Sequence, residues 1–414
     1  MNRTFGGRRH ALNLCSLYVS LGINAILNLG LIAYLARVLQ PEIWGLVLLT
    51  QAFGIWVALI PEYGFSLSAG RAIAQSRGAE EIAIIAQSVN ASKALLSVLV
   101  LPAGAIALFA LSGFRADPAF LAGGMLFAVA QGLDPVWFFQ GTERQYLYAV
   151  LSTMARLIVF GLIVALVRAP DDGWIVMFLH AAGALFIFGI AWVFMIWTLP
   201  RRRIHFGDVR AMLRSAWPIF QFRGAQSLTV NSSLVILGIV SPAGVQAFGS
   251  AERIIRNCLG LLGPISAAGM PRIARLLGTD PHAARATARL SFAVMTGSGI
   301  VIGGLLFVLA APVVRILLGT NYEFVIPVLR MVSLSLPFAA ASSMIGVQWM
   351  LPVGLDRQLV RITLVAGLLN VAGCAILGAT FGAMGVAITM VAVEALTLVL
   401  MLVTLRHAEQ AGFW

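Results

Sequence analysis

The chain has 414 residues, of which 60% are hydrophobic and only 11% are charged, and its formal net charge is +12. Because soluble domains hold about 25% charged residues, this composition excludes an ordinary water-soluble fold and indicates a protein solvated by lipid. The basic residues lie between apolar runs rather than together on one polar surface. They therefore indicate an oriented membrane protein and not one that binds nucleic acid.

The N-terminal segment combines three arginines with a long uncharged run. The run covers residues 11–36 and is 26 residues long, whereas a cleaved signal peptide has an apolar region of about 7–15 residues. We therefore expect it to remain as the first membrane span. The three cysteines all fall inside apolar runs and have no disulfide or zinc-binding spacing.

Twelve apolar runs approach the length of about 20 residues that a helix needs to cross the hydrocarbon core. In chain order they are Leu14–Leu39, Gly45–Ile60, Ala91–Leu111, Phe120–Phe139, Leu147–Val167, Trp174–Leu199, Trp217–Val240, Ala247–Gly269, Leu290–Ala311, Val325–Met350, Val360–Phe381 and Ala383–Leu405. Backbone polar groups cannot stay unpaired in lipid, and these runs lack the alternation of barrel strands. The sequence therefore predicts an all-α, polytopic membrane protein with twelve transmembrane helices.

The segment Leu199–Arg214 interrupts the apolar pattern near the middle of the chain. It holds five arginines in sixteen residues, so we interpret it as a cytoplasmic joint between two halves. The prediction is an N-terminal lobe of six helices, residues 1–200, and a C-terminal lobe of six helices, residues 201–414.

The distribution of basic residues predicts the orientation. With the N-terminus inside, 19 basic residues fall in inside segments, Lys93 among them, and four fall in outside segments. This bias is the one expected when both termini are cytoplasmic.

Six stretches form recognisable motifs: Leu35–Gly45, Tyr63–Arg71, Trp137–Glu143, Ala251–Ile255, Gly263–Ile265 and Met270–Leu276. These stretches resemble the Wzx-type polysaccharide-repeat flippases of the multidrug/oligosaccharidyl-lipid/polysaccharide exporter superfamily. The motifs around Gly64–Arg71 and Phe138–Gly141 are fairly specific when taken together. The resemblance runs from about residue 11 to residue 280 and continues as matching hydropathy to the end.

The resemblance implies a MATE-like fold with two lobes around a central cavity. It also implies a bacterial inner-membrane protein that moves oligosaccharide repeat units, linked to a polyprenyl diphosphate such as undecaprenyl diphosphate, from the cytoplasmic to the periplasmic leaflet by alternating access. Expected partners are this lipid-linked substrate and, in the same system, the polysaccharide polymerase and chain-length proteins.

Five arginines lie inside predicted spans and are the candidate substrate-binding residues: Arg156, Arg223, Arg253, Arg256 and Arg330. Only three acids, Asp134, Glu252 and Glu394, lie at comparable depth. A charge at membrane depth is costly and normally faces a cavity or a partner. The cationic excess therefore suggests a water-filled cavity that attracts a diphosphate, which arginine can bind through two parallel hydrogen bonds.

Each candidate also has a structural interpretation. Arg253 and Arg256 share a helical face, but either could pair with an acid on a neighbouring helix. Arg223 and Arg330 lie near span ends, where a long side chain can reach the membrane surface. Arg156 lies within reach of Asp134, so the two could form a structural ion pair.

Glu394 and Asp134 are the candidate ion-coupling residues. Glu394 lies in the middle of the last predicted span with no basic residue nearby in the sequence. It could take part in coupling to protons or cations, or it could be a neutral, hydrogen-bonded structural acid.

Two other functions remain as alternatives to a flippase. An ion-coupled multidrug exporter for cationic drugs would need a net acidic interior, which is the opposite of what this chain has. A membrane polymerase or ligase would need a larger periplasmic loop than any here. The sequence contains no nucleotide-binding glycine loop, metal-ligand cluster or nucleophile–base pair, so we expect no enzyme activity, no cofactor and no metal.

Overall fold

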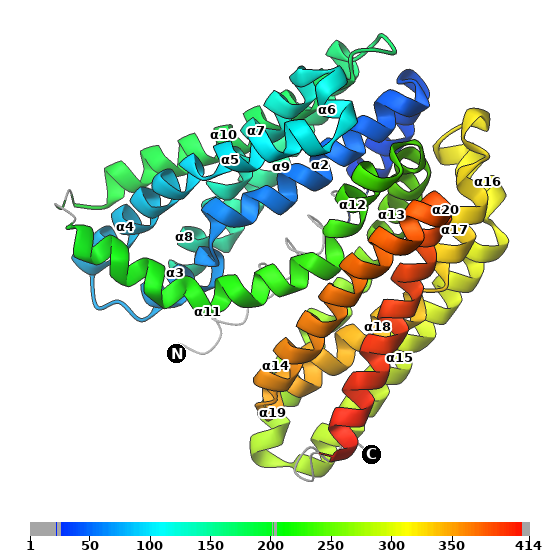
Figure 1. The fold of residues 1–414 in the computed structure, drawn as a ribbon. Helices are drawn as coiled ribbons and strands as arrows, with labels where there is room; N and C mark the ends of the chain where they lie inside the picture. The colour runs from blue at the N-terminus through cyan, green and yellow to red at the C-terminus, as the bar shows by residue number, and fades with distance from the viewer. Residues whose placement is uncertain (1–21, 23–25, 201, 203–204, 408–414) are drawn as a thin grey trace. The chain divides into compact units, whose positions relative to one another are not determined.

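The computed structural model describes residue 22, residues 26–200, residue 202 and residues 205–407 (Figure 1). These residues form helices joined by short loops, with no strand among them, which confirms the predicted all-α membrane fold. The predicted first span, Leu14–Leu39, lies partly outside the described residues. Its described part forms the helix Ile26–Val38.

The chain divides into two compact units, Met1–Gly224 and Ala225–Trp414, which we call the N-terminal unit and the C-terminal unit. The division falls inside helix α11 (Phe206–Val230). The predicted lobe boundary between residues 200 and 201 stays a prediction.

Among its described residues, the N-terminal unit contains nine helices besides Ile26–Val38 and most of α11. They are α2 (Pro41–Glu62), α3 (Phe65–Ala74), α4 (Ala79–Val98), α5 (Val100–Ala110), α6 (Ser112–Ala116), α7 (Pro118–Gly132), α8 (Val136–Gly141), α9 (Gln145–Leu166) and α10 (Gly173–Thr198). Helix α7 packs against α2 and α10, and α3 packs against α8.

The C-terminal unit begins in the last turns of α11 and continues to the end of the described chain. Its helices are α12 (Ser232–Val240), η1 (Pro242–Gly244), α13 (Val245–Gly260), α14 (Gly263–Thr279), α15 (Pro281–Val308), α16 (Ala310–Leu317), η2 (Thr320–Tyr322), α17 (Val325–Ser333), α18 (Leu336–Ser343), η3 (Met344–Met350), α19 (Leu351–Val353) and α20 (Asp356–His407). Helix α20 consists of two arms that meet at Gly382, where φ is 57° and ψ is −133°.

Eight helical segments among the described residues are long and apolar enough to cross a membrane. This number is lower than the twelve predicted spans for identifiable reasons. Helix α20 contains two predicted spans in one continuous segment. The first predicted span is described only as the short helix Ile26–Val38. The seventh and eighth predicted spans are also not among the eight, because α11 carries several charged residues and α12, α13 and α14 are only 9, 16 and 17 residues long.

Two interruptions in the N-terminal unit are stabilised by acidic side chains. Between α2 and α3, Tyr63 and Gly64 both have positive φ, 46° and 80°, and the Glu62 carboxylate accepts hydrogen bonds from the backbone N–H groups of Gly64 at 2.9 Å and Ser66 at 3.1 Å. Between α7 and α8, Asp134 accepts a hydrogen bond from the Val136 N–H at 2.8 Å. Backbone donors freed by a helix break need a partner in a membrane, so the breaks hold two carboxylates within spanning segments.

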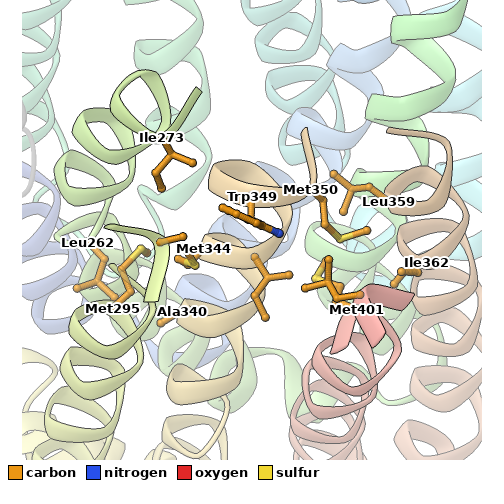
Figure 2. Packing of buried hydrophobic residues seen from close by; sticks show 13 residues of the cluster. Leu262, Ile273, Met295, Ala340, Met344, Trp349, Met350, Leu359, Ile362 and Met401 are labelled. Atoms are coloured by element: carbon orange, nitrogen blue, oxygen red, sulfur yellow. The ribbon is translucent and has the colours of Figure 1, made fainter. Parts of the chain in front are cut away.

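The core of the C-terminal unit is rich in methionine. Met295, Met344, Met350 and Met401 pack around Trp349, which is 1% exposed (Figure 2). Methionine side chains fill irregular space between helices. The π-helix η3 supplies several of these residues, so this unit packs around an irregular helix.

Residue Gln348 of the same π-helix is fully buried in this apolar core. Its side-chain Oε1 accepts a hydrogen bond from the Ser291 hydroxyl at 2.7 Å, which satisfies a polar group that would be costly to bury alone.

Candidate functional site

A cavity of about 230 Å³ lies in the N-terminal unit at the two helix breaks. Its polar lining comes from Glu62, Ser66, Lys93, Gln131, Asp134 and Arg223. We call it the N-terminal polar cavity. It gathers side chains from α2, α3, α4, α7, α11 and the α7–α8 break into one polar pocket.

Lys93 is fully buried beside this cavity, with 1% of its surface exposed. Its Nζ donates hydrogen bonds to the backbone carbonyl oxygens of Gly132 and Asp134, both at 2.8 Å. The charge distribution along the sequence counts Lys93 among the cytoplasmic basic residues, and that orientation stays a prediction. Helix α4 begins at Ala79, before the predicted span, and Lys93 lies within the segment Ala79–Ala110, which is long and apolar enough to cross a membrane.

Arg223 faces the same cavity from α11. Its Nη1 lies 3.1 Å from Oε2 of Glu62, whose side chain is 14% exposed. Of the two orientations that the sequence left open, toward a cavity or toward the membrane surface, the structure has the first. Glu62 therefore both caps α3 and pairs with α11, a role that the sequence pattern did not reveal.

Arg156 lines a second cavity of the N-terminal unit, with a volume of about 170 Å³, together with Asp134, Gln131, Tyr148 and His180. Asp134 does not pair with Arg156 in the described part of the chain. Its Oδ2 instead accepts a hydrogen bond from the Tyr148 hydroxyl at 2.7 Å, so the predicted ion pair is wrong. Asp134 and Gln131 line both cavities.

The C-terminal unit brings three of the predicted residues together. Arg256 donates to Oε1 of Glu252 through Nη2 at 2.6 Å and Nε at 3.2 Å, and also to the backbone carbonyl of Val230. Glu252 is 8% exposed. Glu394 on α20 lies within the electrostatic reach of Arg256, which a reading of sequence neighbours alone could not show.

The other three candidate arginines, Arg156, Arg253 and Arg330, have no ion pair with an acid among the residues that the structure describes. Arg253 is half-buried on α13, close enough to feel the charges of Arg256 and Glu252. Arg330 is exposed on α17. Two of the five predicted arginines are thus held in ion pairs, and Arg156, Arg253 and Arg330 keep their guanidinium groups available.

The chemistry of these clusters suits anions. The structure adds one cation, Lys93, and one acid, Glu62, to the candidate charges inferred from the sequence, so the cationic excess among them is unchanged. A guanidinium group can donate paired hydrogen bonds to a phosphate. Within the described ranges, no three His, Cys, Asp or Glu side chains come together in a way that could hold a metal ion.

Comparison with solved structures supports the fold. The chain superposes on the lipid II flippase MurJ in an inward closed conformation with a TM-score of 0.74 and 12% identity, covering 95% of this chain and 87% of MurJ. It also superposes on an inward-facing multidrug resistance MATE family transporter of the MOP superfamily, with a TM-score of 0.67 and 16% identity, covering 92% of this chain and 97% of the transporter. The MATE-like helical architecture expected from the sequence is confirmed.

Sequence comparison gives two curated relatives over nearly the whole length. One is the "Putative O-antigen transporter" of Escherichia coli (strain K12), 28% identical over 400 residues, which are 95% of this chain and 96% of the relative. The other has the same name in Shigella dysenteriae and is 27% identical over 395 residues, 94% of this chain and 98% of the relative. Residues 11–277 match the family described as "Polysaccharide biosynthesis protein". Since this match covers more than half of the chain, and includes the motifs from which the resemblance was inferred, the protein belongs to the polysaccharide biosynthesis protein family.

Proposed function

We propose that this protein is a flippase that moves polyprenyl-diphosphate-linked oligosaccharide repeat units from the cytoplasmic to the periplasmic leaflet of the bacterial inner membrane. The observation that carries the proposal is the family match together with two relatives, both named as O-antigen transporters, that align over more than nine-tenths of the chain. The protein is a multi-pass membrane protein and a transporter rather than an enzyme. The inner-membrane location and the cytoplasmic termini are part of the proposal.

The charges of the two units support an anionic passenger. Of the five candidate arginines, Arg156, Arg253 and Arg330 have no ion pair among the described residues, and we assign them to the diphosphate or to acidic sugars. Arg223 and Arg256 are already paired with Glu62 and Glu252. They would bind a phosphate by exchanging a carboxylate oxygen for a phosphate oxygen, so that the guanidinium never lies unpaired in a low-dielectric site.

The prenyl tail remains in lipid throughout, because moving it through a polar cavity would expose a long apolar chain to water. Only the headgroup and its sugars then need an enclosed path. Alternating access of two helical lobes would supply this path without opening the membrane to ions.

Coupling to an ion gradient is assigned to Glu394 and Asp134. Glu394 is half-buried and subject to the charge of Arg256, and Asp134 lines both N-terminal cavities. Replacing Glu394 by glutamine keeps the shape of the side chain and removes its charge. Export in Glu394→Gln should therefore no longer depend on the gradient, and unchanged dependence would remove Glu394 from this role.

The decisive experiment deletes the chromosomal gene and analyses surface glycans and lipid-linked intermediates. The expected result is loss of one surface glycan with accumulation of lipid-linked repeat units on the cytoplasmic side. Complementation with Arg253→Gln should fail. Arg315→Gln is the matched control, since Arg315 is exposed and paired with exposed Glu323 at 2.7 Å, and it should complement.

The same deletion separates the alternatives. Intact glycans with a new sensitivity to cationic drugs would replace the flippase by a multidrug exporter. Dependence of export on the co-expressed polymerase and chain-length proteins would support the proposed partnership with them, and full export in their absence would contradict it.

A further inference from the structure

Lysine is used once in this chain. The 28 basic residues are 27 arginines and Lys93. Arginine stays protonated at any pH that a cell experiences, whereas a buried lysine can release its proton. The chain thus places its one lysine in a fully buried position, while none of the described arginines is buried to that extent.

The hydrogen bonds of Lys93 fit both protonation states. A neutral amine has two N–H groups, and Nζ has two backbone acceptors, the carbonyl oxygens of Gly132 and Asp134. A protonated ammonium has a third N–H group, for which the N-terminal polar cavity provides room and polar neighbours. The carbonyl oxygens of Gly132 and Asp134 keep their hydrogen bonds whether Lys93 is neutral or protonated. The energetic cost of leaving a buried polar group without a hydrogen bond therefore favours neither protonation state.

The charged neighbours also tolerate either state. Glu62 on α2 and Asp134 in the α7–α8 break act electrostatically on Lys93. Each carboxylate has its own donors, Arg223 and two N–H groups for Glu62, and Tyr148 and one N–H group for Asp134.

The other helices against α4 add little charge. Helix α3 carries only Arg71, which is exposed, and α5 and α7 carry no titratable side chain. With Lys93 protonated, the two cations and two carboxylates at the cavity balance, and with Lys93 neutral the cavity attracts a proton.

Building on the proposed function, we propose that Lys93 carries a coupling proton of the transport cycle, in addition to the groups to which coupling is assigned above. In the releasing step the Nζ–H bond breaks, the proton passes to water in the N-terminal polar cavity, and the electron pair stays on nitrogen as its lone pair. The reverse step restores the ammonium from the other side.

The same site connects the proton to the helix break. Gly132 is the last residue of α7 and Asp134 lies in the break. A hydrogen bond from an ammonium is roughly twice as strong as one from a neutral amine. Protonation of Lys93 therefore holds the break between α7 and α8 more tightly, and release of the proton loosens it.

The single lysine allows a direct test on the full-length protein in lipid nanodiscs. Protein produced with ¹³C,¹⁵N-lysine and a lysine-free tag has one labelled side chain, so one Cε–Nζ resonance reports its protonation. We expect this resonance to change at a lower pH than that of an exposed lysine, because burial disfavours the charged form. Arg210→Lys adds an exposed reference lysine on α11, which should titrate near the usual value of about 10.4. If Lys93 titrates together with this reference, or shows no change across the range, the proposal is overturned.

A second measurement ties the titration to transport. Lys93→Arg keeps the positive charge but cannot release a proton, so a membrane-inserted variant should lose surface glycan export. Normal gradient-dependent export by Lys93→Arg would contradict the proposal. The two proposals fail separately: intact glycans after gene deletion refute the flippase, whereas a silent Lys93 resonance refutes the proton carrier whatever the cargo is.

Discussion

The break between α2 and α3 allows a quantitative prediction. Gly64 has φ of 80°, and a Cβ there would lie 2.8 Å from Cγ2 of Ile219 and 3.0 Å from the backbone nitrogen of Phe220. The left-handed conformation costs an L-residue about 1–2 kcal/mol, and overpacking costs about 1–3 kcal/mol. The stiffer unfolded chain of an alanine variant offsets about 0.4–1 kcal/mol. We therefore expect Gly64→Ala to lower the free energy of unfolding by about 2–3 kcal/mol.

Unfolding by SDS in mixed micelles can measure this loss. Gly161→Ala in α9 is the matched control, because a Cβ at Gly161 has no neighbour within 4 Å and alanine is favoured over glycine in a helix by roughly 0.5–1 kcal/mol. The control should unfold at the same or a slightly higher SDS fraction. If Gly64→Ala is as stable as the control, the close approach of α11 to this break is not a feature of the folded protein.

Three further predictions concern charged side chains. A double-mutant cycle on Glu62 and Arg223, measured as unfolding free energy, should give a coupling of about 1 kcal/mol, intermediate between exposed and buried pairs, and additive effects would contradict the ion pair. Arg256→Ala should lower the free energy of unfolding by about 1–3 kcal/mol, because it leaves the buried Glu252 unpaired. Replacement of the exposed Arg330 by alanine should change the free energy of unfolding by less than about 0.5 kcal/mol. Equal effects of the two substitutions would contradict this prediction. Hydrogen bonds from the N–H groups of Ala169 and Arg168 lower the pKa of the Asp172 carboxyl below its usual value. Because the pKa of Asp172 is lower in the folded state than in the unfolded state, its carboxylate should stabilise the loop fully above the unfolded-state pKa, and this stabilisation should be lost as the pH falls through the folded-state pKa. Amide exchange or an NMR titration of the carboxyl group would measure the loss. A loop that stays unchanged at low pH would refute the prediction.

The helical architecture could be predicted because lipid imposes a simple requirement. An uncharged run long enough to cross the bilayer must pair its backbone internally, so composition alone indicates both the helices and their approximate positions. The predicted runs from Gly45 onward all fall on helical segments of the structure. The family could also be predicted from the sequence, since motifs such as Tyr63–Arg71 lie within residues 11–277, the region that matches the family.

The cavity chemistry could not be predicted in the same way. Hydropathy marks where a run is apolar and not where its helix begins, so the sequence did not reveal that α4 starts at Ala79 and that Lys93 is buried within the N-terminal unit. The partner of Asp134 depended on the α7–α8 break, which turns the carboxylate toward Tyr148 rather than Arg156. Glu62 lay outside every predicted span, although its position directly before Tyr63 and Gly64 at a break is the signal that could have identified it.

The π-helix η3 makes the C-terminal unit sensitive to chain length at one place. A π turn holds about one residue more than an α turn, so the segment Met344–Met350 accommodates an extra residue without turning the helix beyond it. Removing one residue would let the segment relax to α-helical spacing, and the side chains beyond the deletion would keep their direction. Inserting one residue before Trp349 would instead rotate the side chains beyond it by about 100° about the helix axis, which would turn Trp349 and Met350 out of the methionine core. This segment should therefore accept the loss of a single residue far more readily than a further insertion.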